Sequence, residues 1–398
     1  MAHSMRVLHI YRTYFPDPPG GLQEAIRQIS AGCRALGVES AIYTLSPTPS
    51  PTVIPRPEGD VVRGLSYWAP ASCDLGGPAE FRLFREQARQ ADVLHYHFPW
   101  PFADLLNLLP GVRRPKVMTY HSDIVKQQVL GRLYQPLMRH TLADMDAVVA
   151  TSPAYAATSD VLRRFVPAGR LKVIPLGMNE PASAAADDAI LDRLGLRGRP
   201  FVLALGVLRY YKGLHHLVEA ARAVRGTVVL AGSGPEEPRL RELAQKLGVD
   251  NVVFAGQVSE AEKHSLLAHC AALCLSSHLR SEAYGMVLLE AAMHARPMVS
   301  CEIGTGTSFI NADGVTGYVV PPENPAALAQ ALNRLLDDPQ TAATMGRQAR
   351  QRYESYFTGD IMAGAYLDLY RSVAGHARKN GEVHRRVDGA VRSANTHD

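Results

Sequence analysis

Two acidic residues bracket the stretch Glu282-Ala-Tyr-Gly-Met-Val-Leu-Leu-Glu290, whose composition favours a helix. The spacing predicts Glu282 just before the first helical turn and Glu290 two turns inside the helix. The first carboxylate suits a sugar hydroxyl and the second suits a ribose. A helix N-terminus also presents free amides and a favourable dipole to phosphate; here they are those of Tyr284, Gly285, Met286 and Val287. The alternative is an ordinary amphipathic helix with a capping acid.

A basic loop, Gly206-Val-Leu-Arg209-Tyr-Tyr-Lys212-Gly213, leaves one predicted strand and opens a helix. A guanidinium and an ammonium at a strand end can clamp a diphosphate, so Arg209 and Lys212 are candidates for that task. A single surface lysine is more often a solvated charge, but the strand–loop–helix context favours binding here. A later loop, Cys301–Ser308, offers backbone donors to an anion or forms a tight turn; its candidates are Gly304, Thr305 and Gly306.

The first half of the chain carries further candidates at predicted strand ends. Gly20 and Gly21 lie between the first strand and the first helix, where their amides can face a ligand. His121 follows a strand in Thr119-Tyr-His121-Ser-Asp123, as a substrate contact or a structural hydrogen-bonding group. The aromatic stretch His97-Phe98-Pro-Trp100-Pro-Phe102 is either core packing or an apolar platform for an acceptor. The acceptor-side candidates are His97, Trp100 and Asp123.

Strand-like and helix-like segments alternate along nearly the whole chain, which predicts an α/β protein with parallel sheets. Expected strands in the first half are Arg6–Tyr11, Ser40–Leu45, Val61–Tyr67, Asp92–His97, Lys116–Tyr120, Ala147–Ala150 and Leu171–Ile174. A second series comprises Phe201–Leu205, Thr227–Ala231, Val252–Phe254, Ala271–Leu275, Pro297–Ser300 and Gly317–Val319. The proline-rich segment Pro47–Pro57 is expected to be a loop. Two doubly wound domains facing a cleft would bind ligands at the carboxyl ends of their strands.

Length and composition limit the alternatives. The 398 residues are 46% hydrophobic with a net charge of +4, which excludes a disordered chain and gives no reason to expect nucleic-acid binding. Five scattered cysteines make neither a disulfide framework nor a metal motif, and Asp144-Met-Asp146 is interpreted as local structure. A linker-like stretch at Pro175–Ala186 marks the domain boundary. We expect domains at 5–178 and 179–357, a helix at 358–375 returning to the first domain, and a disordered basic tail at 376–398.

Together these motifs resemble the retaining nucleotide-sugar glycosyltransferases of family GT4, which have the GT-B fold. Further matching segments are Leu230-Ala-Gly232-Ser-Gly234-Pro235, Val253-Phe-Ala-Gly256-Gln-Val258, Val173–Gly177 and Val315–Pro321. The chain departs from the family pattern at Val207, where an arginine is usual, at Ser276, where a proline is common, and at the Gly304 loop.

The resemblance implies a role for each candidate. Glu282 would contact the transferred sugar, Lys212 the diphosphate, and Glu290 the ribose, while the segment ending at Val258 would read the nucleobase. Arg209 is the local substitute for the missing arginine. The first domain would bind the acceptor and the second the nucleotide-sugar, and neither a metal nor another cofactor is needed.

Local strings around Arg209, Arg280 and Glu302 look like bacterial O-antigen and common-polysaccharide transferases that use GDP-mannose or GDP-D-rhamnose. The resemblance implies a lipid-linked saccharide acceptor, a polyprenyl diphosphate in class, and surface-polysaccharide synthesis. We expect a cytoplasmic protein that is peripheral on an anionic inner-membrane surface. The predicted helix Val129–Ala143 has the pattern of a core-facing amphipathic helix first and of a membrane-surface helix second. The alternatives are a sugar-phosphate synthase or nucleotide-sugar epimerase on the same fold, and a catalytically silent assembly subunit.

Overall fold

The computed structural model describes residues 4–17, 20–70, 73–124, 128–181 and 186–375, the side chains of residues 128–133 excepted. The tail 376–398, expected to be disordered, lies outside these ranges. The chain forms two compact units. The first holds the chain up to Ala150, Asp160–Ile174 and the helix that begins at residue 359, and the second holds Thr151–Ser159 and Pro175–Thr358.

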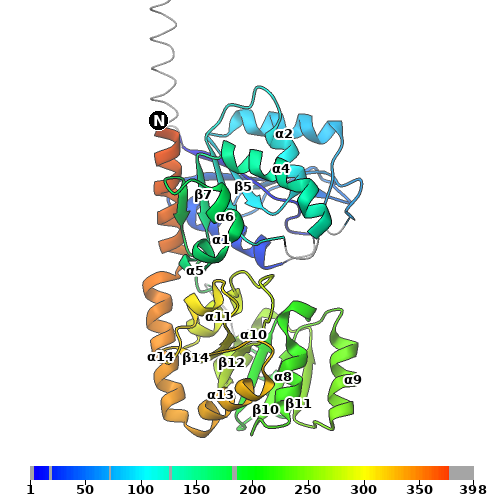
Figure 1. Ribbon diagram of the computed structural model, residues 1–398, viewed down its shortest axis with the longest axis vertical. Helices are drawn as coiled ribbons and strands as arrows, with labels where there is room; N and C mark the ends of the chain where they lie inside the picture. The colour runs from blue at the N-terminus through cyan, green and yellow to red at the C-terminus, as the bar shows by residue number, and fades with distance from the viewer. Residues whose placement is uncertain (1–3, 18–19, 71–72, 125–127, 182–185, 376–398) are drawn as a thin grey trace, which may run out of the picture. The chain divides into compact units, whose positions relative to one another are not determined.

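The first unit, whose ribbon is drawn in Figure 1, is built on a sheet for which the pairing of strands gives eight members in the order β3-β4-β2-β1-β5-β6-β7-β8. Its strands are β1 (Arg6–Ile10), β2 (Glu39–Ser46), β3 (Val53–Ile54), β4 (Asp60–Leu65), β5 (Val93–Phe98), β6 (Lys116–Tyr120), β7 (Ala147–Ala150) and β8 (Leu171–Val173). Each neighbouring pair is parallel except β3 with β4. The expectation that Pro47–Pro57 is entirely loop is therefore wrong at β3. The two residues that pair there are not prolines, and the strand lies at the sheet edge, where neighbouring prolines are tolerated.

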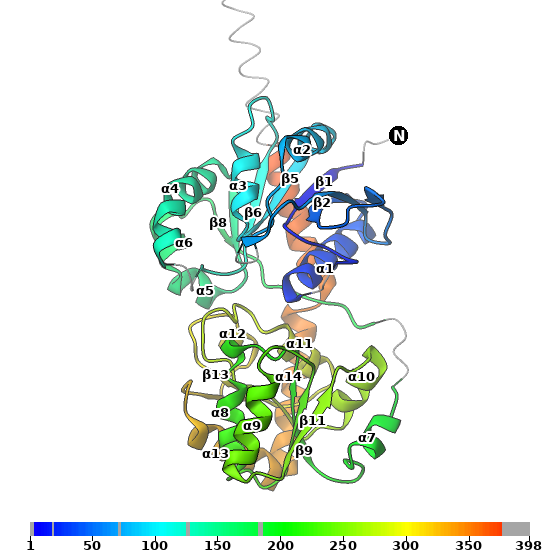
Figure 2. The same cartoon turned by 90° about the vertical axis from the view of Figure 1, so that its right-hand side faces the viewer.

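Helices of the first unit occur where apolar residues recur with helical spacing. They are α1 (Gly21–Ala35), α2 (Pro78–Gln90), α3 (Pro101–Asn107), α4 (Gln128–Asp144) and α6 (Asp160–Phe165). In α1 the buried side chains include Ile26, Ile29 and Cys33, on one face of the helix. The helix at residues 359–375, orange to red in Figure 2, packs on this unit. The Tyr370 hydroxyl lies 2.7 Å from His95 Nδ1, and the Cys33 thiol donates to the Ala363 carbonyl.

The second unit has a six-stranded parallel sheet in the order β11-β10-β9-β12-β13-β14. The strands are β9 (Phe201–Leu205), β10 (Thr227–Ala231), β11 (Val252–Gly256), β12 (Ala272–Leu275), β13 (Met298–Cys301) and β14 (Gly317–Val320). Its helices are α5 (Pro153–Thr158), α7 (Ala189–Arg193), α8 (Leu214–Ala221), α9 (Glu237–Leu247), α10 (Glu260–His269), α11 (Met286–Met293), α12 (Thr307–Ile310), α13 (Pro325–Asp337) and α14 (Pro339–Tyr356), with a 3-10 turn, η2, at Tyr210–Lys212. The predicted α/β class with two doubly wound sheets is confirmed.

The strand order identifies where a ligand should bind in the second unit. Numbered along the chain, its six strands run 3-2-1-4-5-6, so the order reverses between β9 and β12. In open parallel sheets the crevice for ligands lies at this reversal, outside the carboxyl ends of the two strands. The loops that leave these ends are the basic loop after β9 and the acidic loop after β12. No described helix is long and apolar enough to cross a membrane.

Candidate functional site

The basic and acidic loops meet through Lys212 and Glu282. Lys212 ends η2, which follows β9, and its Nζ lies 2.8 Å from Glu282 Oε2. Both side chains are 12% exposed. Hydrogen bonds also join the loops: the Ser276 hydroxyl donates to the Lys212 carbonyl at 3.0 Å, and the His278 amide donates to the Tyr211 carbonyl at 3.0 Å. The strand reversal therefore brings together two residues that sequence analysis assigned to one substrate.

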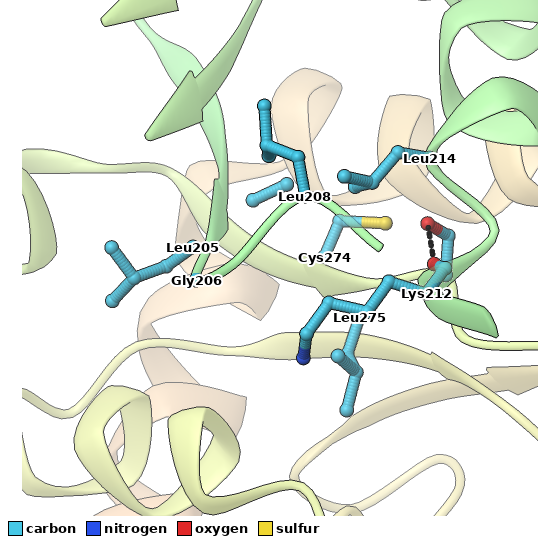
Figure 3. A pocket seen from close by; sticks show the side chains of 9 residues that line it. Leu205, Gly206, Leu208, Lys212, Leu214, Cys274 and Leu275 are labelled. Carbon is cyan, nitrogen blue, oxygen red and sulfur yellow. Dashed lines mark hydrogen bonds between the residues drawn. The ribbon is translucent and has the colours of Figure 1, made fainter. Parts of the chain in front are cut away.

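An apolar pocket adjoins this ion pair. Lys212 reaches into it from the loop, beside the aliphatic side chains of Leu205, Leu208, Leu214 and Leu275 (Figure 3). Burial by itself lowers the pKa of the Lys212 ammonium, but the Glu282 carboxylate more than compensates, so its pKa is raised. Lys212 is thus charged at neutral pH. Low-polarity walls strengthen the attraction between this charge and any anion nearby.

Close backbone approach in this region depends on Gly213. Its φ of +61° is left-handed, and a Cβ there would lie 2.2 Å from the Ser276 carbonyl oxygen. Only glycine fits such a position without displacing the loop. Gly213 therefore fixes how closely the loop after β9 lies against the loop after β12.

The loop after β13 is hydrogen-bonded to Glu282, whose carboxylate is also hydrogen-bonded within its own loop. The Thr305 hydroxyl donates to the Glu282 carbonyl at 2.8 Å, and the Ser277 hydroxyl donates to the Glu282 carboxylate at 3.1 Å. The amides of Gly304 and Gly306 donate to Glu302 Oε1 and to the Ala283 carbonyl. Of the two alternatives for this loop, donors to an anion or a tight turn, these two amides fit the turn, because they donate within the loops themselves.

Helix α11 begins beside Glu282. Gly285 caps it with a left-handed φ of +87°, and Met286 and Val287 start the helix. First-turn amides have no partner within their own helix, so this end suits a phosphate. Tyr284 is buried, and its hydroxyl donates to the Leu176 carbonyl at 2.6 Å, so its side chain anchors the turn.

Glu290 lies further along α11 and is held by a residue that sequence analysis missed. Lys263 of α10 places its Nζ 2.8 Å from Glu290 Oε1 and 2.7 Å from Glu260 Oε2. Burial lowers the pKa of the Lys263 ammonium, but Glu290 and Glu260 together outweigh burial, so this pKa is raised. No sequence motif marked Lys263, since its partner is set by helix packing.

Other donor candidates sit at the same edge of the second sheet. Arg209 is exposed and is the N-cap residue of η2. Its positive charge lowers the pKa of Lys212, so the two cations lie within electrostatic range of each other. Val207, at the position where the family usually has an arginine, is 43% exposed. Val258 is half-buried just after β11. Loops after β9, β10 and β11 are linked, because the Leu208 amide donates to Ser233 and the Gly232 amide donates to Gly256.

Candidates of the first unit lie at the end of its central strands. His97 on β5 bridges two other histidines: its Nδ1 is 3.0 Å from His121 Nε2, and its Nε2 is 3.1 Å from His9 Nδ1. Burial lowers the pKa of His9 and of His121 to about 3, and burial and neighbouring histidines lower that of His97. These imidazoles are neutral at pH 7. Asp123 accepts from the Tyr120 hydroxyl at 3.0 Å.

The aromatic residues after β5 are core. Phe98, Trp100 and Phe102 are at most 2% exposed, and the Trp100 indole donates to the Asp74 carbonyl at 2.8 Å. An acceptor platform at Trp100 is therefore wrong for this structure, because the ring is buried beside Tyr43 of β2 and Phe102 of α3. Gly20 caps α1 in an extended conformation and Gly21 begins the helix, as expected.

The interpretation of Asp144-Met-Asp146 as local structure agrees with the contacts of both acids. Asp146 accepts from the Lys116 amide and Asp144 pairs with the Lys116 ammonium, so both acids are local structure. Two groups of three histidines nevertheless bring their ring nitrogens within 4.8 Å of one another: His9, His95 and His97, and His215, His216 and His278.

The sequence matches two family profiles that together span most of the chain. One is described as "Glycosyl transferases group 1" and matches residues 188–352, and the other as "Glycosyl transferase 4-like domain" and matches residues 20–177. The first profile contains every strand of the second sheet, β9 to β14, and the second profile contains the strands of the first sheet from β2 to β8 but not β1.

Similar full-length proteins are known. The chain is 41% identical over 369 residues to O-antigen chain mannosyltransferase C of Escherichia coli, covering 93% of this chain and 99% of that protein. It is 44% identical over 359 residues to D-rhamnosyltransferase WbpZ of Pseudomonas aeruginosa, covering 89% and 92%. Among solved structures, a sucrose-phosphate synthase of Thermosynechococcus elongatus has the same fold, with a TM-score of 0.77 at 24% identity over 94% of this chain and all of that one.

Proposed function

Because this chain belongs to the group 1 glycosyl transferases and has the GT-B fold, we propose that it transfers a mannose-type sugar from a GDP-sugar to a lipid-linked saccharide, with retention of anomeric configuration. The observation that supports this most is the Lys212–Glu282 pair at the strand reversal of the second sheet. A buried cation, a carboxylate and free helix amides there match the charge and hydroxyl pattern of a nucleotide-sugar.

The geometry suggests how each group would act. The Lys212 ammonium, with Arg209 and the α11 amides, would stabilise the charge on the leaving diphosphate. Glu282, released from its pair with Lys212, would accept from a hydroxyl of the transferred sugar. Glu290 would accept from the ribose, with Lys263 holding it in place.

Transfer needs one bond exchanged for another. The acceptor hydroxyl oxygen bonds to the anomeric carbon as the bond from that carbon to the diphosphate oxygen breaks. The hydroxyl proton passes to the departing diphosphate, so atoms and charge balance without a further reactant. The protein supplies positioning and electrostatic stabilisation.

The first experiment tests which nucleobase the protein prefers. Calorimetry with GDP, UDP and ADP should show GDP binding at least tenfold more tightly than the other two. Stronger UDP binding would overturn the choice of donor while leaving the transferase assignment intact.

The sugar and the acceptor follow from a donor screen. One close relative is named a mannosyltransferase and the other a D-rhamnosyltransferase, so GDP-mannose and GDP-D-rhamnose are the two donors to compare. Mass spectrometry should detect one added hexose or deoxyhexose on a polyprenyl-diphosphate-linked saccharide. Transfer to a free sugar phosphate alone would favour a synthase, and no turnover with any donor would favour a silent assembly subunit.

A lipid-linked acceptor implies contact with the cytoplasmic face of a membrane. The first unit presents exposed aromatic and basic side chains near the start of α2: Tyr67 and Trp68 are 63% and 67% exposed, and a shallow pocket is lined by Phe81, Arg82 and Arg85. Aromatic rings and arginines suit the headgroup region of an anionic bilayer. The sequence pattern of the helix Val129–Ala143 favours core packing before membrane contact. In α4 Met138 is buried, and the side chains of residues 129–133 lie outside the described residues.

Flotation tests this surface. Wild-type protein should float with vesicles that contain anionic lipid at low salt, and Trp68→Ala with Arg82→Ala should reduce the floated fraction several-fold. The pair Arg347→Ala and Arg334→Ala, on helices of the second unit, is the control. Equal flotation of both pairs would refute this surface.

A further inference from the structure

Three histidines lie close in sequence to Lys212 and Glu282. His215 and His216 lie in the first turn of α8, just after Lys212, and His278 lies in the loop after β12, just before Glu282. Their ring nitrogens lie within 4.8 Å of one another. Nothing in the transfer reaction requires them.

The rings are arranged as ligands of one ion would be. Zinc binds imidazole nitrogen at about 2.1 Å, which puts ring centres about 5 Å apart in a tetrahedral site. The His278 ring centre lies 5.2 Å from that of His215 and 5.2 Å from that of His216. The centres of His215 and His216 are 4.0 Å apart, so these two rings need only turn slightly away from each other.

His278 is the strongest sign of a missing ligand. It is 6% exposed, and both of its ring nitrogens are buried without a hydrogen-bond partner. Buried polar groups are normally paired, and a bound ion is one of the few explanations for an unpaired one. His216 Nδ1 likewise has no hydrogen bond, and Glu219 Oε2 lies 3.7 Å from it, where a carboxylate could orient the ring.

The chemistry favours a transition metal over magnesium or calcium. Imidazole nitrogen suits zinc, copper and nickel, whereas the harder ions prefer oxygen. His215 and His216 are partly exposed, which leaves a path for an ion from solvent.

The other histidine group, His9, His95 and His97, differs in both its hydrogen bonding and its exposure. His95 and His97 use both ring nitrogens in hydrogen bonds, and all three members are at most 1% exposed. An ion would have neither lone pairs on these two rings nor a route to them. That group is part of the core of the first unit.

We propose that His215, His216 and His278 bind one zinc-class metal ion, which ties the loop after β9 to the loop after β12. The ion would leave one coordination position for water and would hold in register the two loops that meet at Lys212 and Glu282. It is a structural clamp and takes no part in sugar transfer.

Calorimetric titration of the chelator-treated, full-length protein with zinc chloride alone tests the site. We expect one ion per chain, with binding weakened at least tenfold in His278→Ala and in His216→Ala. The control is His140→Ala, which removes an exposed histidine of α4 and should change the affinity less than twofold. No nucleotide is present, so the result is independent of the proposed transferase activity.

Two further measurements keep the test decisive. Cobalt in place of zinc should give the intense visible absorption of a four-coordinate site in wild-type protein, lost in His278→Ala. If His278→Ala unfolds, as judged by circular dichroism, the half-exposed His215→Ala replaces it. Absence of zinc binding by the wild type, or equal affinity in the cluster variants and His140→Ala, would overturn the proposal.

Discussion

Replacing Lys212 should separate the catalytic role of this residue from its structural one. Lys212→Met keeps the aliphatic stem in the apolar pocket but removes the charge that pairs with Glu282 at 2.8 Å. Loss of one preorganised donor to a developing charge typically costs about 2.7–4 kcal/mol of transition-state stabilisation. We therefore expect kcat/KM for sugar transfer to fall about 100- to 1,000-fold.

The same substitution also affects folding. It leaves Glu282 as a carboxylate only 12% exposed, without its cation. Breaking one side of a buried ion pair costs about 3 kcal/mol at the low end of the usual range. Urea denaturation at pH 7 should report a loss of this order in the free energy of unfolding.

The double variant Lys212→Met with Glu282→Gln distinguishes the two effects. Removing both charges should restore most of the lost stability, because no uncompensated carboxylate remains. Activity should not return, because neither the diphosphate nor the sugar then has its charged partner. Lys212→Arg, which keeps the charge, should lose less activity than Lys212→Met.

Two results would refute this reasoning. One is a kcat/KM for Lys212→Met within threefold of the wild type. The other is recovery of activity together with stability in the double variant, which would make Lys212 a purely structural residue. Initial rates with saturating acceptor, measured beside the urea curves, give both quantities from one preparation.

Three further outcomes follow from the same structure. Gly213→Ala should weaken GDP binding at least tenfold in calorimetry and lower the melting temperature, because its Cβ would lie 2.2 Å from the Ser276 carbonyl oxygen; unchanged values would contradict the loop contact. Glu290→Gln should weaken binding of GDP more than binding of free diphosphate, since the carboxylate is assigned to the ribose; an equal effect on both would contradict that role. Protonation of His121 should lower the free energy of unfolding by about 2 kcal/mol between pH 7 and pH 5. The pKa of His121 is about 3 in the folded protein, so over this range the imidazole gains a proton in the unfolded chain but not in the folded one. Urea curves for His121→Gln should show a fall that is smaller by this amount.

Much of the site was predictable because its parts are local in the chain. An apolar run followed by Gly206–Gly213 and a helical segment already indicates a strand, a loop and a helix start. The same holds for the loop before α11, and strand boundaries were correct within one or two residues at most positions. The short strand β3 was missed because two residues between prolines carry no periodic signal.

The contacts of buried side chains were not predictable in this way. Composition left open whether Trp100 is a platform or core, and it is core because Tyr43 of β2 and Phe102 of α3 pack beside its ring. Lys263 has no motif, yet it pairs with Glu290 because α10 packs beside α11. The sequence left open whether the Gly304 loop offers donors to an anion or forms a tight turn, and the amides of Gly304 and Gly306 pair within their own unit.

By itself, then, the order of amino acids determined which residues stand at strand ends and helix starts, since those depend on periodicity, glycine and charge within a few positions. Only the tertiary structure decided which of them meet. Lys212 and Glu282 are 70 positions apart, and they touch because β9 and β12 are neighbours in the sheet. The same strand pairing draws His278 towards His215 and His216, a cluster that no local pattern could reveal.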